Sequence, residues 1–161
     1  MLHTSYKILV GWLVLAALAA CTKESTKNTN VDDAPDLAAA PVIQLIRVNQ
    51  QTVQEYQDTL IFTVQYLDGD GDLGFDDADS TTIYLIDNRD STALVFEYPL
   101  SPRAPQGAAV AVQGELHIYL QNPIRINQQQ SSEQTTFSIR LRDRAQHWSN
   151  TVVSPTITIT S

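Results

Sequence analysis

The chain has 161 residues and a formal net charge of −8 at pH 7. This length allows one ordinary domain, which can bury a stable core without disulfides. The acidic balance, without a dense basic patch, excludes the charge pattern of a protein that binds a phosphate backbone. We therefore expect no nucleic-acid partner.

The first twenty residues have the pattern of an export signal. The segment MLHTSYKILVGWLVLAALAAC has a polar start with Lys7, an apolar run over 8–20, and then Cys21. The run is too short to span the roughly 30 Å hydrocarbon core of a bilayer comfortably. It predicts a signal peptide over 1–20, which the lipobox described next makes that of a lipoprotein, and not a resident transmembrane helix.

The end of this segment, Leu18-Ala19-Ala20-Cys21, resembles the lipobox of bacterial lipoproteins. In that family the cysteine is acylated and becomes the first residue of the mature chain. Each buried acyl methylene contributes about 0.8 kcal/mol, so several chains hold a domain firmly at a membrane. The resemblance implies a cell-envelope protein anchored to the outer membrane through Cys21, with its periplasmic or surface location left open. The alternative is an ordinary secretory signal, although Cys21 is the only cysteine and has no disulfide partner within the chain.

Residues 21–40 are rich in Thr, Asn, Asp and Ala and have no apolar periodicity. Such a segment cannot bury enough surface to offset its ordering entropy. We predict a flexible tether over 21–40 and a folded domain over 41–161.

From residue 41 onward the apolar residues recur with a period of two. In FSIRLRD, for example, Phe137, Ile139 and Leu141 alternate with polar residues, as in a half-buried strand. No convincing helical period occurs between such segments. The pattern predicts seven strands, at about 42–49, 59–67, 81–87, 93–98, 114–121, 137–143 and 151–160.

Seven short antiparallel strands with this spacing predict an all-β fold, an immunoglobulin-like antiparallel β-sandwich. A small barrel is the main alternative. Pro155 falls within the last strand. Because proline is tolerated at sheet edges and bulges, this strand should lie at an edge or break there.

Six aspartates lie between positions 68 and 79, in the loop after the second strand. In the predicted topology this loop shares one end of the sandwich with the loop at 143–150. Two carboxylates about 5 Å apart repel by roughly 1 kcal/mol in a water-like medium and about 3 kcal/mol at an effective dielectric of 20. Several of them in one loop favour a bound cation.

The ligand type and spacing favour calcium. Asp68, Asp70 and Asp72 alternate with glycines that let the backbone wrap, and oxygen-only ligands suit a hard ion. An EF-hand is not expected, because Leu73 stands where that motif needs glycine and strands flank the loop. The alternative is a solvated turn in which Asp and Gly serve local hydrogen bonding. The candidate metal ligands are Asp68, Asp70, Asp72, Asp76, Asp79 and Asp143.

A family resemblance rests on two segments, FTVQYLDGDGDLGFDD and FSIRLRDRAQHWSNTVVSPTITI. Together with the lipobox they resemble the small lipoproteins of Bacteroidota-type bacteria that carry a single Ig-like domain. The resemblance implies a location and a fold but no activity. Where related Ig-like modules have Gly-Asn in the terminal segment, this chain has Gln146 and His147.

Catalytic motifs are weak, so we expect no enzyme. His117 and His147 have no metal-binding spacing and no nucleophile motif beside them. Glu97 and Glu115 are scattered glutamates, and no spacing identifies them as a glycosidase pair.

The function expected from the sequence is a non-catalytic structural or interaction module in the envelope, stiffened by calcium. The alternative is a carbohydrate- or peptide-binding accessory lipoprotein of a surface uptake system. Trp148 is the candidate contact for an envelope protein or glycan, or else it plugs its own sandwich. Arg140, Arg142 and Arg144 are expected on a solvent face, paired with acids across the sheet.

Overall fold

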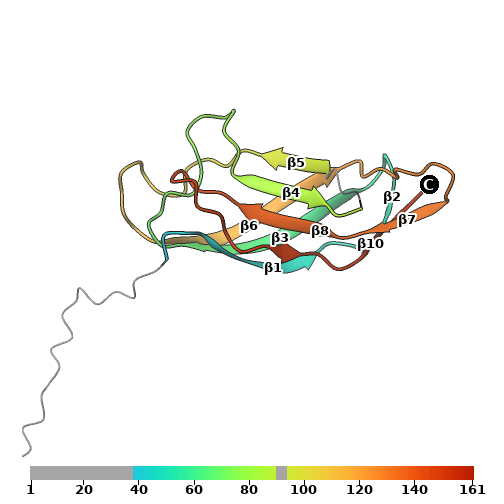
Figure 1. Cartoon of the computed structure of the whole chain (residues 1–161), viewed down its shortest axis with the longest axis horizontal. Coiled ribbons are helices and arrows are strands. Elements are labelled where there is room, and N and C mark those ends of the chain that lie inside the picture. Colours follow the sequence, from blue (N-terminus) through green and yellow to red (C-terminus); the bar gives the residue numbers. More distant parts are fainter. Residues whose placement is uncertain (1–37, 90–93) are drawn as a thin grey trace, which may run out of the picture. The chain divides into compact units, whose positions relative to one another are not determined.

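The computed structural model of the chain describes residues 38–89 and 94–161 (Figure 1). The predicted signal peptide, Cys21 and nearly all of the predicted tether lie outside these residues and stay predictions. Within the described ranges, no helix is long and apolar enough to cross a bilayer.

The described part of the chain is built from strands. They are β1 (Val42–Val48), β2 (Thr52–Gln54), β3 (Thr59–Asp68), β4 (Ile83–Asp87), β5 (Leu94–Tyr98), β6 (Val112–Gln121), β7 (Ser132–Thr135), β8 (Phe137–Leu141), β9 (Val152–Val153) and β10 (Ile157–Thr160). Each of the seven predicted strands corresponds to at least one of them. The short strands β2 and β7 were not predicted.

The strands form three sheets, with the orders β1-β3-β6, β5-β4-β8-β9 and β2-β10-β7. All pairings are antiparallel except that of β2 with β10. One hydrophobic core draws on residues of all three sheets. The prediction of an all-β, immunoglobulin-like sandwich is confirmed, and the short sheet β2-β10-β7 extends it at one end (Figure 1).

The core follows from the alternation along β3 and β8. In β3, Leu60, Phe62 and Val64 have no exposed surface, and Phe62 meets Phe137 of β8 edge to face with the ring centroids 5.3 Å apart. Full burial of such a side chain contributes about 1.5–3 kcal/mol. Every residue of β3 is paired with β6, from Thr59 opposite Gln121 to Asp68 opposite Val112. The register therefore fixes where β3 ends and the aspartate loop begins.

The last predicted strand is broken at Pro155, one of the two outcomes expected for it. β9 pairs with β8, whereas β10 joins the short sheet between β2 and β7. At the break, Ser154 Oγ accepts a hydrogen bond from Phe137 N at 2.9 Å and donates one to Pro155 O at 2.8 Å. The serine thus satisfies backbone groups where the chain changes sheets.

Candidate metal centre

Asp68 ends β3 inside the protein, with no exposed surface. Its Oδ2 accepts a hydrogen bond from Leu73 N at 2.9 Å, and the Leu73 side chain is itself fully buried in the core. The leucine that breaks the EF-hand pattern therefore anchors this loop to the sandwich.

Glycines allow the loop to curl tightly. Gly71 has a φ of +71°, and a Cβ added there would lie 2.0 Å from the carbonyl oxygen of Val110. Gly74 has a φ of +90°, and an added Cβ would lie 2.4 Å from Ser101 O. No other residue fits either place without moving backbone. The loop therefore packs closely against the segment that leads into β6.

The loop that follows β8 meets the aspartate loop, as the predicted topology requires. The Arg144 guanidinium donates to Gly74 O at 2.8 Å, and Ala145 N donates to Asp72 Oδ2 at 2.9 Å. Arg144 N also donates to Asp72 O at 3.3 Å. These hydrogen bonds join two loops that are about seventy residues apart in the sequence.

Three carboxylates converge where the loops meet. Asp68, Asp72 and Asp143 each offer an oxygen, and these oxygens all lie within 4.8 Å of one another. Asp68 and Asp143 have no exposed surface. Among the described residues, the buried Oδ1 atoms of Asp68, Asp70 and Asp72 have no hydrogen-bond partner. We call Asp68, Asp70, Asp72 and Asp143 the acidic cluster.

Burial and the neighbouring carboxylates raise the pKa values of Asp68 and Asp72. Burial raises the pKa of Asp68 to about 6, and the charges of Asp70, Asp72 and Asp143 add to the rise, while the hydrogen bond from Leu73 N opposes it. Burial also raises the pKa of Asp72, with Asp143 as the next cause. Deprotonated carboxylates are thus costly here unless a cation accompanies them.

Asp143 is held in place by the turn that follows it. Its Oδ1 accepts from His147 N at 2.8 Å, and its Oδ2 lies 3.1 Å from His147 Nδ1. His147 is exposed on its other side. It orients the Asp143 carboxylate through these two contacts.

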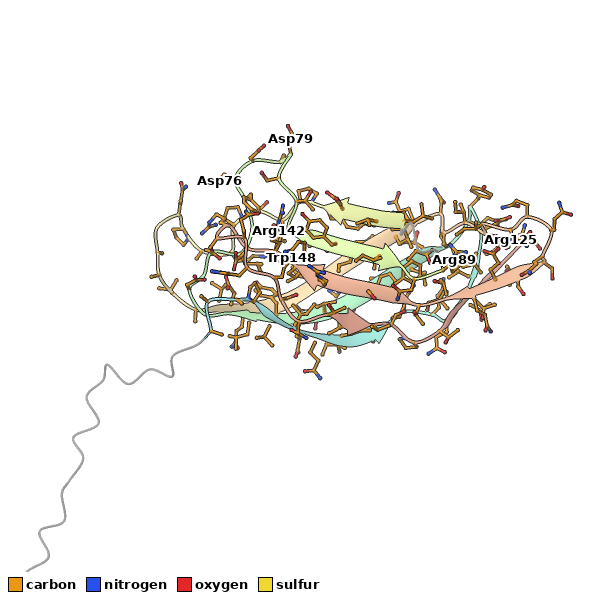
Figure 2. All side chains as sticks on the ribbon, viewed as in Figure 1. Asp76, Asp79, Arg89, Arg125, Arg142 and Trp148 are labelled. Atoms are coloured by element: carbon orange, nitrogen blue, oxygen red, sulfur yellow. The ribbon has the colours of Figure 1, made fainter. Side chains whose placement is uncertain are left out.

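The remaining predicted ligands lie apart from the cluster. Asp76 and Asp79 are exposed, on the part of the loop that projects from the sandwich (Figure 2). Between them Asp77 forms a local turn, since its carboxylate accepts from Asp79 N at 3.0 Å and from Ser80 Oγ at 3.1 Å. The aspartate-rich loop therefore has two parts, a buried first half that converges with Asp143 and a solvated turn.

The geometry of the acidic cluster suits a hard cation. Calcium binds six to eight oxygens at about 2.3–2.6 Å, so oxygens that share one ion lie at most about 5 Å apart. The 4.8 Å limit among the oxygens of Asp68, Asp72 and Asp143 meets that condition. Because the group contains only oxygen ligands, it does not favour zinc, which prefers nitrogen and sulfur.

Trp148 lies on the outer face of the β5-β4-β8-β9 sheet, beside this end. It is 40% exposed and therefore does not plug the core. The centroid of the Trp148 ring is 4.8 Å from that of the Tyr84 ring. The Arg140 guanidinium lies 3.8 Å from the centroid of the Trp148 ring. Arg142 lies 5.4 Å from both rings, and Figure 2 shows it next to Trp148. We call Tyr84, Arg140, Arg142 and Trp148 the Arg–Trp patch.

The expected pairing of the three arginines with acids is not observed. Within the part of the chain that the structure describes, no ion pair within 4.0 Å includes Arg140, Arg142 or Arg144. Arg140 and Arg142 lie against aromatic rings, and Arg144 donates to loop carbonyls. The sequence pattern does not reveal these contacts, because they depend on the turn that brings Trp148 back to Arg142 through a single β-bridge.

Apart from His147, the residues weighed for catalysis lie on edge strands. His117 Nε2 is 3.4 Å from Glu115 Oε1, and both side chains are exposed on β6. Glu97 lies on β5, where it accepts a hydrogen bond from Thr81 Oγ1 at 3.0 Å. Glu97 and Glu115 thus belong to different sheets.

Fold and site together define a class: a small all-β sandwich with a buried acidic cluster between two loops. Comparison with family models, curated proteins and solved structures finds no match. A function must therefore be argued from the geometry of the site.

Proposed function

We propose that the protein is a non-catalytic structural or interaction module of the cell envelope, anchored through Cys21 and stiffened by calcium in the acidic cluster. One observation carries the calcium proposal. The buried Oδ1 atoms of Asp68, Asp70 and Asp72 have no hydrogen-bond partner among the described residues, and Asp68 and Asp72 converge with Asp143. Buried polar atoms without partners are rare in folded proteins and call for an explanation.

Calcium explains these atoms better than the other common cations. It accepts flexible, oxygen-rich coordination, and carboxylates and backbone carbonyls are its ordinary ligands. Magnesium demands a near-ideal octahedron and keeps several waters, which a set of buried carboxylates suits less well. Asp70, whose Oδ1 is also buried, is the natural further ligand beside the converging three.

The ion would act as a link between loops. Asp68 and Asp72 belong to β3 and the loop after it, whereas Asp143 follows β8 in the opposite sheet. One cation bound to all three would hold the two sheets together at this end. A ligand that binds only the folded state stabilises it by mass action, by about 2.7 kcal/mol at one hundred times its Kd.

The location rests on the lipobox and on the resemblance to small Bacteroidota-type lipoproteins. Export would place the loop where calcium is plentiful. Mass spectrometry of the native protein tests the anchor. We expect the mature chain to begin at an acylated Cys21, and an unmodified N-terminus upstream of Cys21 would contradict it.

Calorimetric titration with calcium tests the site. The sample for this titration is the chain from residue 21 with Cys21→Ser, which cannot be acylated at that position. We expect binding that raises the melting temperature, and we expect Asp68→Asn/Asp72→Asn to abolish both effects. The matched control is Asp76→Asn/Asp79→Asn, which makes the same charge change on the exposed part of the same loop. Equal loss in both variants, or no binding by the parent, would refute the proposal.

A binding role, and not only a structural one, is favoured by the Arg–Trp patch. Its tryptophan is exposed, its two arginines are half-buried, and within the described residues neither arginine joins an ion pair.

A further inference from the structure

We propose that the Arg–Trp patch binds an acidic segment of a protein partner in an extended conformation. The inference deepens the proposed interaction role and rests on it. It names the surface that makes the contact and the chemistry of the partner.

The aromatic rings of the patch hold its arginines in positions from which their guanidinium groups can bind an anion. The Arg140 guanidinium lies 3.8 Å from the centre of the Trp148 ring, and Arg142 lies 5.4 Å from the rings of Trp148 and Tyr84. Attraction between guanidinium and ring restricts each side chain. The N–H groups at the rim of a stacked guanidinium remain able to bind a carboxylate in a bidentate manner.

The charge of these arginines is not neutralised within the described residues. No carboxylate there forms an ion pair with Arg140 or Arg142, and the buried Nε of Arg142 has no hydrogen-bond partner. The acid nearest in register is Glu97, opposite Tyr84, and it accepts from Thr81. Two such cations on one face are complementary to an acidic ligand, which they must attract against the net charge of −8 of the whole chain.

The spacing of the arginines favours an extended peptide. Arg140 is in β8, and Arg142 continues the same extended run through its bridge to Trp148. Alternate residues of extended backbone point to one side and lie about 6.6–7 Å apart. Alternate acidic side chains of an extended ligand have the same spacing, so an acid-x-acid segment places one carboxylate on each arginine.

The composition of the patch favours a protein over a sugar. Trp, Tyr and Arg are the residues most enriched among interface positions that contribute most to binding. A sugar would need an open aromatic face on which to stack, whereas Arg140 already lies over the Trp148 ring.

Fluorescence anisotropy of a labelled peptide tests the proposal. The probe is fluorescein-Thr-Glu-Thr-Glu-Thr-Glu-Thr, titrated at low salt and in calcium with the chain from residue 21 carrying Cys21→Ser. We expect saturable binding that the Gln-for-Glu peptide does not show. Arg140→Ala/Arg142→Ala should weaken binding at least about tenfold. Arg140→Lys should recover little of the affinity that alanine loses at this position, because lysine keeps the charge but cannot form the bidentate hydrogen bonds of a guanidinium.

Arg47→Ala is the matched control for the single variant Arg140→Ala, since each removes one arginine and Arg47 is an exposed residue of β1 in the other sheet. We expect it to change affinity by less than about twofold. Equal weakening by this control would show that the loss of affinity depends only on the net charge of the protein. That outcome would refute the proposal. So would stronger binding of polygalacturonate than of the peptide, or no peptide binding at 1 mM, roughly the weakest affinity worth calling specific.

Calcium calorimetry on the same variants separates this inference from the proposed function. The patch variants should bind calcium like the parent, since no residue of the patch belongs to the acidic cluster. Absence of peptide binding with calcium binding intact would refute the inference alone. Absence of calcium binding in the parent would refute the calcium proposal, whatever the peptide does.

Discussion

The two ends of the sandwich treat buried carboxylates in opposite ways. At the arginine end, Arg89 pairs with Asp87 at 2.5 Å and with Glu133 at 2.7 Å, and Arg125 pairs with Glu55 at 2.6 Å. Figure 2 shows Arg89 and Arg125 together at this end, far from Trp148 and Arg142. At the acidic end, three carboxylates converge and the nearby Arg144 donates to carbonyl groups instead.

The difference predicts which end would respond to a bound cation. The hydrogen bond to Arg125 lowers the pKa of Glu55 to about 2, whereas burial raises the pKa of Asp68 to about 6. One end supplies its own countercharge and is complete as folded. The other leaves a demand for positive charge that an external cation can meet, so the stability of that end alone should respond to calcium.

The largest effect is expected from breaking the arginine end. Asp87 is 2% exposed and accepts hydrogen bonds from Arg89 and from Thr135 Oγ1. Asp87→Ala should cost about 3–5 kcal/mol of unfolding free energy, because it leaves a buried guanidinium with less countercharge. Denaturant unfolding measures the loss, with the exposed Glu115→Ala as control. Rescue of Asp87→Ala by calcium would contradict the division between the two ends.

A glycine substitution sharpens the comparison at the acidic end. Gly71→Ala should cost about 1–3 kcal/mol from its left-handed backbone alone, with a clash against Val110 O in addition. Gly107→Ala is the matched control, since Gly107 has a φ of +82° and nothing within 4 Å of an added Cβ. We expect only Gly71→Ala to lower calcium affinity in calorimetry. Equal effects would show that the close packing of the loop is unimportant.

The effect of Asp72→Asn on the stability of the fold should have opposite signs in chelator and in calcium. In chelator, Asp72→Asn relieves repulsion within the acidic cluster and should stabilise the fold by about 1 kcal/mol. In calcium the same variant should be less stable than the parent, because a ligand is lost. The amide oxygen can still accept from Ala145 N, so the local fold is preserved. Thermal melts in both buffers measure the reversal, and the same sign in both would argue against a metal.

The smallest effect at neutral pH is expected from removing a whole ion pair. Glu55→Gln/Arg125→Met deletes both charges, and such replacements are often nearly neutral. In the parent the pKa of Glu55 falls from 4.5 to about 2 on folding. The pair therefore stabilises fully above about pH 4.5, and its contribution is lost as the pH falls towards 2. Melting curves from pH 7 to 2 should have a shallower acid slope in the double variant. An unchanged slope would mean that the pair contributes nothing.

Much of the fold could be predicted because burial imposes alternation on the strands. Phe137, Ile139 and Leu141 are all fully buried, as their spacing requires. The strands β2 and β7 could not be predicted in this way. Each has a single buried side chain, Val53 or Thr135, and is identified by its pairing with β10.

The candidate site was predictable where it depends on topology. The sandwich brings Asp143 to the loop after β3, so the convergence with Asp68 and Asp72 was foreseen. The sequence alone did not distinguish these residues from the exposed Asp76 and Asp79, because the distinction depends on Leu73 entering the core. No sequence pattern predicts the ion pairs of the arginine end either, since Glu55 and Arg125 are 70 residues apart.

The change of sheets at Pro155 also affects how the chain can be assembled. The final strand is the middle strand of its sheet, and its Thr160 hydroxyl bonds to Val53 O, 107 residues earlier. Proteins rich in contacts of such long sequence separation fold slowly. Because β10 carries the fully buried Ile157 and Ile159, the core is complete only once this strand has joined its sheet. If the chain is exported as we propose, its core would be completed only when translocation is nearly finished.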